Sequence, residues 1–467
     1  MKLSSKVEFM PEKDYFNGLH KRKNLLRILQ VSTLDIAGGA ERIAWNLFQA
    51  YQQAGFDSWL ATGFKQSANP NVLLVQNDIY SNNWSRVWFV LGDLFIGLRG
   101  VPGAGQIRNL LYRAGRFNRW LNIQRGHDDF GFPGAWHLLD LPPERPYIIH
   151  CHNLHGGYFD LRALPWLSHQ VPVFLTLHDA WLLSGHCAHS FSCERWKTGC
   201  GHCPDLTIPP AVQRDATAYN WKRKRGIYTK SKFHISTPSR WLMDKIQESM
   251  LMEGAIECRV IPNGVDISIF NPGDCVEARA QLGLPLEAKI VIFVANSIKE
   301  NIWKDYTTIR KAIDQVAQRF ESEKMIFIAL GEDAPDEHIG SADIHFISYQ
   351  DDVNDVALYY RAADVYVHAA RADTFPNTVL ESLACGTPVV ATAVGGIPEQ
   401  IEHSLTGFLV QPGDASEMAN RIEQVLTDNI LRNKMSAKAA KVASNRFSLD
   451  NQVKAYLGWY REILEKW

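Results

Sequence analysis

Residues 371–399 read RADTFPNTVLESLACGTPVVATAVGGIPE, and this stretch decides the fold. It follows the apolar run DVYVHAA, which is typical of a buried strand, and it predicts a loop, a helix with Pro376 in its first turn, a turn at Gly386 and another strand. Free amides at the start of such a helix favour a phosphate group. Glu381 lies about one turn into the helix, where its carboxylate can accept hydrogen bonds from a ribose diol.

Strand-like runs and helical stretches alternate along the rest of the chain. The first series begins with LLRILQVSTL at residues 25–34, and the second begins near Glu257 with CRVIPNGVD. The alternation predicts an α/β protein with two doubly wound domains, at 1–245 and 258–445, followed by a C-terminal helix over 446–467. Ligands of such sheets bind at the carboxyl ends of the strands.

The 371–399 segment resembles the retaining family 4 glycosyltransferases of the GT-B fold. Those enzymes carry an acidic residue and a glutamate with seven residues between them, then Ala-Cys-Gly-Thr-Pro and a paired-glycine loop, and Asp373 and Glu381 match the two acids. The resemblance implies two Rossmann-like domains that face a cleft, the N-terminal one on the acceptor side. It also implies that Glu381 holds the nucleotide ribose. Asp373 stands where the family usually has glutamate, which shortens its reach by one methylene.

The same resemblance implies further site residues. Lys304 matches a lysine that binds the donor diphosphate, whereas Asn296 or Ser297 occupies the position of the family's arginine, and Lys299 is an alternative source of charge. His178 ends a strand and corresponds to a histidine beside the reacting sugar. The implied catalytic residues are His178, Asp373 and Lys304, and the implied donor-binding residues are Gly38, Gly39, Lys304, Phe375, Pro376, Asn377, Thr378, Glu381 and Glu332.

The resemblance implies transfer of a sugar from a nucleotide-sugar, a UDP- or GDP-sugar, to a glycan or lipid-linked glycan. It further implies retention of configuration, no catalytic metal and a role in cell-surface polysaccharide biosynthesis. Two alternatives stay open at this point. One is a nucleotide-sugar epimerase or hydrolase on the same fold, and the other is a non-catalytic nucleotide-sugar-binding partner.

Four cysteines lie close together at 187–203, within the segment GHCAHSFSCERWKTGCGHCP at residues 185–204. They are Cys187, Cys193, Cys200 and Cys203. Such a cluster suits a structural zinc ion held by four thiolates, with nearby histidines as alternative ligands. Two disulfides or four unligated thiols are the rival interpretations. A subset of polysaccharide-assembly transferases resembles this stretch.

Arginines and aromatic residues interleave over residues 83–125, where Asp93 is the only acidic residue. Such a segment can lie on an anionic membrane, with rings at the headgroups and arginines on phosphates. The alternative is an ordinary helical insertion whose rings belong to the core. The arginines are Arg86, Arg99, Arg108, Arg113, Arg116, Arg119 and Arg125.

Composition excludes several classes of protein. The chain has 467 residues, 46% hydrophobic and 21% charged, which is typical of a globular protein. Lys plus Arg number 49 and Asp plus Glu number 50, so there is no whole-molecule basic field for nucleic acid. The first residues lack the apolar core of a signal peptide, and the apolar run 88–98 is too short to span a bilayer. We therefore expect a cytoplasmic protein at the inner face of the membrane.

Overall fold

The computed structural model describes residues 26–36, 38–98, 101, 103–320 and 323–467. The N-terminal leader and Arg99 lie outside these residues. The chain divides into two compact units. One comprises residues 1–115 and 130–174, and the other comprises residues 116–129 and 175–467. The predicted boundaries at 245 and 258 stay predictions.

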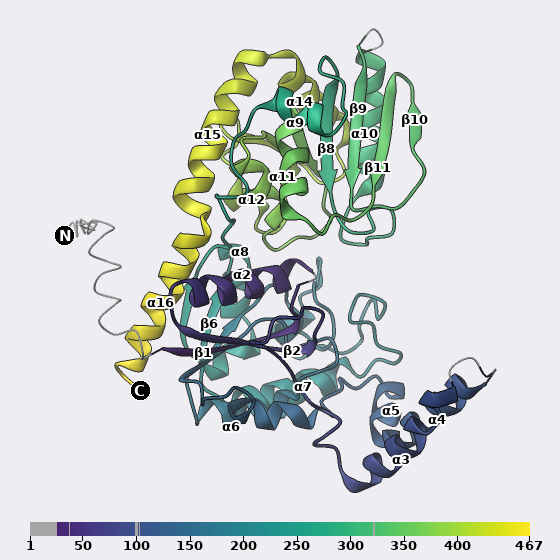
Figure 1. The fold of residues 1–467 in the computed structure, drawn as a ribbon, viewed down its shortest axis with the longest axis vertical. Coiled ribbons are helices and arrows are strands. Elements are labelled where there is room, and N and C mark those ends of the chain that lie inside the picture. Colours follow the sequence, from purple (N-terminus) through teal and green to yellow (C-terminus); the bar gives the residue numbers. More distant parts are fainter. Residues whose placement is uncertain (1–25, 37, 99–100, 102, 321–322) are drawn as a thin grey trace. The chain divides into compact units, whose positions relative to one another are not determined.

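The first sheet has seven strands in the order β3-β2-β1-β4-β5-β6-β7 (Figure 1). The register of β1 with β2 and β4, of β2 with β3, and of β6 with β7 is parallel. β-branched and other apolar side chains fill both faces of its central strands, as a doubly covered parallel sheet requires. The strands are β1 Arg27–Leu34, β2 Asp57–Phe64, β3 Val72–Leu74, β4 Ile148–Cys151, β5 Val173–Thr176, β6 Phe233–Thr237 and β7 Ala255–Val260.

The second sheet also has seven strands, in the order β10-β11-β9-β8-β12-β13-β14. Its pairs are parallel except β10 with β11. One core cluster lies under α10 and α14, and another lies under α11, α12 and α15. The strands are β8 Lys289–Val294, β9 Met325–Leu330, β10 Glu337–Ile339, β11 Ala342–Ile347, β12 Val365–His368, β13 Val389–Thr392 and β14 Gly407–Val410.

Helices alternate with the strands in both series, which confirms the expected doubly wound α/β class. The last two helices, α15 and α16, run end to end (Figure 1). The helices that follow the first strands are α2 Gly39–Gln53, α3 Asn83–Asp93, α4 Ala104–Gly115, α5 Phe117–Gln124, α6 Leu164–Ser168, α7 Thr217–Tyr228 and α8 Arg240–Gln247. The later ones are α9 Cys275–Gln281, α10 Tyr306–Arg319, α11 Val353–Ala362, α12 Asn377–Ala384, α13 Ile397–Gln400, α14 Ala415–Thr427, α15 Asn429–Phe447 and α16 Leu449–Leu464.

One strand belongs to a different sheet from the one expected. The run that begins near Glu257 was assigned to the second series, but β7 pairs in parallel with β6 and completes the first sheet. The assignment was wrong because a short strand next to a predicted boundary carries no local signal of its partner.

The C-terminal helix α16 packs against the last strands of the first sheet. The Tyr456 hydroxyl lies 2.8 Å from Thr176 Oγ1 and 3.1 Å from Ser236 Oγ, all three being buried. The indole of Trp459 donates to Glu257 Oε2 at 2.9 Å. Since α16 follows α15, which covers the second sheet, one continuous stretch of chain contacts elements of both sheets.

Among the described residues, none of the helices has the length and apolar character needed to span a bilayer.

Helices α3 and α4 pack against each other. The Ser85 hydroxyl donates to Gly115 O at 2.6 Å, and the rings of Phe89 and Tyr112 stack at 5.0 Å.

Candidate active site

The loop after β12 is held by the segment that precedes α10. Lys304 forms an antiparallel bridge with Ala370, and the amide of Arg371 donates to Trp303 O at 2.9 Å. This pairing brings Lys304 Nζ to 2.7 Å from Asp373 Oδ2, with both side chains mostly buried at 16% and 19% exposure. Two residues that the sequence placed in the catalytic set therefore form one ion pair.

The charge of Asp373 is stabilised by its neighbours. Burial alone would raise the pKa of this carboxyl, but Lys304 and His368 outweigh it and hold the pKa well below its ordinary value. Asp373 is consequently an anion at physiological pH, and Lys304 forms an ion pair with it.

His368, the last residue of β12, was not singled out from the sequence. Burial, with a further contribution from Lys304, lowers its pKa to about 4, so the ring is neutral near pH 7. The Tyr366 hydroxyl donates to Thr378 Oγ1 at 2.8 Å and lies 2.7 Å from His368 Nδ1. On the other side of the ring, His368 Nε2 lies 3.3 Å from Lys304 Nζ and 3.4 Å from Asp373 Oδ2. The position of His368 at the end of a strand was the sequence signal that could have identified it.

The paired glycines pack directly on the loop that carries Asp373. A Cβ on Gly395 would lie 1.8 Å from the carbonyl oxygen of Asp373, and one on Gly396 would lie 2.1 Å from that of Thr374. Gly395 also has φ of +55°, in the left-handed region. The backbone of this loop can therefore approach the Asp373 loop closely only because both residues are glycine.

Helix α12 begins at Asn377, with Pro376 at the N-cap rather than in the first turn as expected. Because proline offers no capping side chain, the first-turn amides have no side-chain cap. Thr378 belongs to the His368 network, and the Asn377 Oδ1 atom accepts from Asn263 Nδ2 at 3.1 Å. Glu381, half-buried, accepts from the Tyr360 hydroxyl at 3.1 Å.

Phe375 does not present its side chain as a ligand contact. It is 5% exposed and packs edge-on against Phe447 in the core of the second sheet. An aromatic residue in a loop motif can fill the core in this way, and the place of Phe375 among the donor-binding residues stays a prediction.

Lys299 is committed to another partner. Its ammonium group lies 2.7 Å from Glu337 Oε1, and its amide donates to Glu332 Oε2 at 3.0 Å. Glu332 follows β9 and Gly331, whose φ is +104°. This pairing does not favour Lys299 as a replacement for the family's arginine.

His178 lies just after β5 and is partly exposed. Burial lowers its pKa to about 4, so it too is neutral near pH 7. Gly38 and Gly39 lie in the other unit, where Gly38 has φ of +87° and precedes α2.

The four cysteines line one small cavity of about 20 Å³, together with His186 and Trp196. His186 Nε2 lies 3.3 Å from Cys203 Sγ, and the amide of Gly185 donates to Cys200 Sγ at 3.3 Å. No group of three or more His, Cys, Asp or Glu in the described part of the chain is arranged to hold a metal ion. The structure therefore does not support the expected zinc site, although it does gather the four residues.

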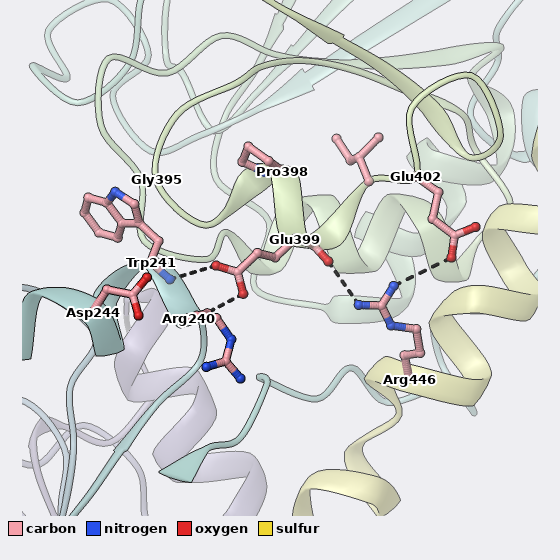
Figure 2. A pocket seen from close by; sticks show the side chains of 9 residues that line it. Arg240, Trp241, Asp244, Gly395, Pro398, Glu399, Glu402 and Arg446 are labelled. Carbon is pink, nitrogen blue, oxygen red and sulfur yellow. Dashed lines mark hydrogen bonds and ion pairs between the residues drawn. The ribbon is translucent and has the colours of Figure 1, made fainter. Parts of the chain in front are cut away.

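A larger pocket of about 620 Å³ lies between α8, α13 and the end of α15 (Figure 2). The Glu399 carboxylate accepts from the amides of Arg240 and Trp241, each at 2.8 Å, and so caps α8. Arg446 donates to the carbonyl oxygen of Glu399 at 3.2 Å. Lys304, Asp373 and Glu381 are not among the residues that line this pocket.

Solved structures share this arrangement of sheets. Sucrose-phosphate synthase from Thermosynechococcus elongatus matches with a TM-score of 0.59 and 17% identity over 95% of this chain and all of that one. Anabaena Alr3699/HepE, solved with UDP and glucose, matches with a TM-score of 0.57 and 16% identity over 93% of this chain and 98% of that one. The chain has the GT-B fold. The GT-B architecture expected from the 371–399 motif is thereby confirmed.

Sequence comparison places a glycosyltransferase-type domain in each half of this GT-B chain. The family described as Glycosyltransferase Family 4 matches residues 37–269, and Glycosyl transferases group 1 matches residues 276–442. The D-inositol 3-phosphate glycosyltransferase of Acidothermus cellulolyticus is 32% identical over 224 residues, 44% of this chain and 48% of that protein. Its Mycobacterium bovis counterpart is 31% identical over 236 residues, 47% of each chain. The chain spans about half the length of these curated relatives.

Replacing Gly396 by alanine should destabilise the protein by about 1–3 kcal/mol, because the added methyl would overlap the Thr374 carbonyl. Thermal unfolding measures the loss. Gly226→Ala is the matched control, since a Cβ there meets nothing within 4 Å and Gly226 lies inside α7. Equal melting temperatures for the two variants would contradict the packing role assigned to the paired glycines.

Acidification should destabilise the His368–Asp373 network. The pKa of His368 is lowered to about 4 in the folded protein, against an ordinary value of 6.5. Between these two pH values the unfolded state binds more protons, so the stability decreases as the pH is lowered. The Asp373 contribution persists until lower pH, because its pKa lies below the ordinary value of 3.8. The melting temperature of His368→Gln, followed from pH 7 to pH 4, should fall less steeply than that of the wild type. Parallel curves would refute this assignment.

Proposed function

We propose that this protein is a retaining glycosyltransferase that uses a nucleotide-sugar donor. The observation that carries the proposal is the Lys304–Asp373 ion pair, set in the loop that leads into the uncapped N-terminus of α12. A diphosphate is the chemical group that this combination of a cation and the N-terminus of a helix suits. The glycosyltransferase names of the matched families and relatives support the same activity.

The donor would bind through its carrier. Glu381, one turn into α12, would accept hydrogen bonds from the ribose hydroxyls, and its bond from Tyr360 fixes the carboxylate. Lys304 and the first amides of α12 would hold the diphosphate. Anabaena Alr3699/HepE was solved with UDP and with UDP-glucose, which favours a UDP-sugar, with a GDP-sugar as the alternative.

Transfer would proceed on one face of the sugar. The bond between the anomeric carbon and the diphosphate oxygen breaks, Lys304 and the helix amides stabilise the negative charge left on the diphosphate, and that diphosphate takes the proton of the attacking acceptor hydroxyl. Asp373 and the neutral His178 would position the sugar. Because the acceptor enters from the side the leaving group departs, configuration is retained.

The Lys304 charge should matter more than that of a neighbouring lysine. Lys304→Met should lower kcat about 10²–10³-fold, because one stabilising cation is removed from the leaving group. Glu381→Gln should raise the KM for the donor about tenfold or more, through weaker hydrogen bonds to the ribose. Lys299→Met is the matched control, since its ammonium group pairs with Glu337. UDP release from UDP-sugars and GDP release from GDP-sugars are the measurements.

Three outcomes separate the alternatives. Donor binding with no nucleotide release would favour a non-catalytic nucleotide-sugar-binding partner. Release without any glycosylated product would favour a hydrolase, and an altered free nucleotide-sugar would favour an epimerase. Full activity of Lys304→Met would refute the proposed role of the ion pair.

The acceptor is proposed to be a glycan or lipid-linked glycan in cell-surface polysaccharide synthesis, reached at the inner face of an anionic membrane. The α3–α4 patch favours this location. Its large apolar side chains are 40–68% exposed, and its described arginines outnumber Asp93, whose carboxylate accepts from the Tyr112 hydroxyl. The α3–α4 patch comprises Val87, Val90, Leu91, Leu94, Ile107 and Leu110, with Arg86, Arg108 and Arg113.

Vesicle flotation tests the membrane proposal. The wild type should float with vesicles that contain phosphatidylglycerol, and less so at high salt, because screening weakens the arginine contribution. The double variant Leu94→Glu/Leu110→Glu should partition at least tenfold more weakly, roughly the loss of two exposed leucine insertions. Leu405→Glu/Ile430→Glu alters two exposed residues elsewhere and is the control. A wild type that stays with the unbound fraction would exclude this surface.

A further inference from the structure

An aromatic cluster lies beside the candidate active site and has no part in the function proposed above. Its members are His189, Phe191, Trp241 and Trp303, and we call it the aromatic platform. The rings of Phe191 and Trp303 stack at 5.7 Å with 17° between their planes. Those of His189 and Trp241 stack at 5.6 Å with 12° between theirs, and His189 meets Trp303 edge-on at 6.2 Å.

The platform is assembled from segments that are far apart in the sequence. His189 and Phe191 come from the cysteine-rich segment, Trp241 from the first turn of α8, and Trp303 from the residue before Lys304. Lys245 Nζ lies 5.1 Å from the ring centroids of both Trp241 and Trp196, which supports the platform from the side of α8.

The rings are not a closed core. Phe191 is 39% exposed, and the other members are partly exposed. Phe191 also has φ of +46°, an uncommon conformation for a bulky residue. Strain of this kind persists where surrounding structure enforces it and clusters at ligand sites. The loop therefore holds an aromatic ring at the surface in a conformation that costs free energy.

The platform adjoins the ion pair. The Trp303 carbonyl accepts from the amides of Arg371 and Ala372, the residues just before Asp373. The charges of Asp373 and Asp179 both act on His189, and Asp179 is the residue next to His178. The platform thus lies within electrostatic range of both segments that carry the proposed catalytic residues.

His189 supplies a polar edge. Its Nδ1 accepts from the amide of Phe191 at 3.0 Å, so the neutral ring carries its proton on Nε2 and can donate a hydrogen bond there. Flat apolar rings edged by a neutral donor match a pyranose, which has C–H bonds on its face and hydroxyls at its rim.

We propose that the aromatic platform binds the pyranose ring of the acceptor, so that the cysteine-rich segment serves as the acceptor-recognition element. The nucleotide has its own partners in Lys304, Glu381 and the amides of α12, which leaves the platform for the other substrate. This inference rests on the proposed sugar transfer.

Saturation-transfer NMR on the full chain tests the platform directly. The probes are the methyl α- and β-pyranosides of glucose, galactose and mannose, and irradiation of aromatic protons should saturate pyranoside C–H protons. Phe191→Leu keeps bulk without a ring and should weaken the signal about tenfold. Phe191→Tyr should retain it. Tyr219→Ala, an exposed ring on α7, is the matched control.

A second measurement distinguishes acceptor binding from other roles. The affinity for UDP and the rate of UDP-glucose hydrolysis by water should change less than twofold in Phe191→Leu. The inference is overturned if the wild type saturates none of the pyranosides, if Phe191→Leu retains the full signal, or if that variant loses UDP affinity in parallel. A wild type that binds pyranosides but no nucleotide-sugar would instead refute the proposed function.

Discussion

The ion pair between Lys304 and Asp373 is the interaction on which the candidate site depends. Two opposite charges in a mostly buried setting stabilise one another only when their geometry is fixed, since each has lost most of its water. The backbone pairing of Lys304 with Ala370 supplies that geometry, and so does the close approach of Gly395 and Gly396 to the loop. The backbone contacts of the protein itself therefore fix the position of the Lys304 charge.

Three of the histidines described above are uncharged near pH 7. His178, His189 and His368 all have their pKa lowered to about 4 by burial, so none adds a positive charge near pH 7. Lys304 is the cation that forms an ion pair with Asp373. Such an arrangement suits electrostatic stabilisation of a leaving group better than proton transfer by an imidazole.

The sequence predicted the architecture because strand–loop–helix periodicity and the glycine pair are local signals. Lys304 and Asp373 were assigned to one site only through the family resemblance, because segments distant in the sequence carry them. In the structure they lie 2.7 Å apart. The sequence missed His368, because a single histidine at a strand end does not reveal that it faces a lysine. It misassigned β7 because sheet membership depends on partners elsewhere in the chain. The four closely spaced cysteines line one cavity, but among the described residues they do not form a metal-ligand arrangement.

The cap that Glu399 places on α8 has a mechanical consequence. Its carboxylate joins the helix after β6 to the short helix after β13 by two charge-assisted hydrogen bonds, and Arg446, in the last turn of α15, donates to the backbone carbonyl of Glu399. Any sliding of α13 past α8 must break both bonds together. These two hydrogen bonds therefore join the first turn of α8 to the helix that follows the paired glycines.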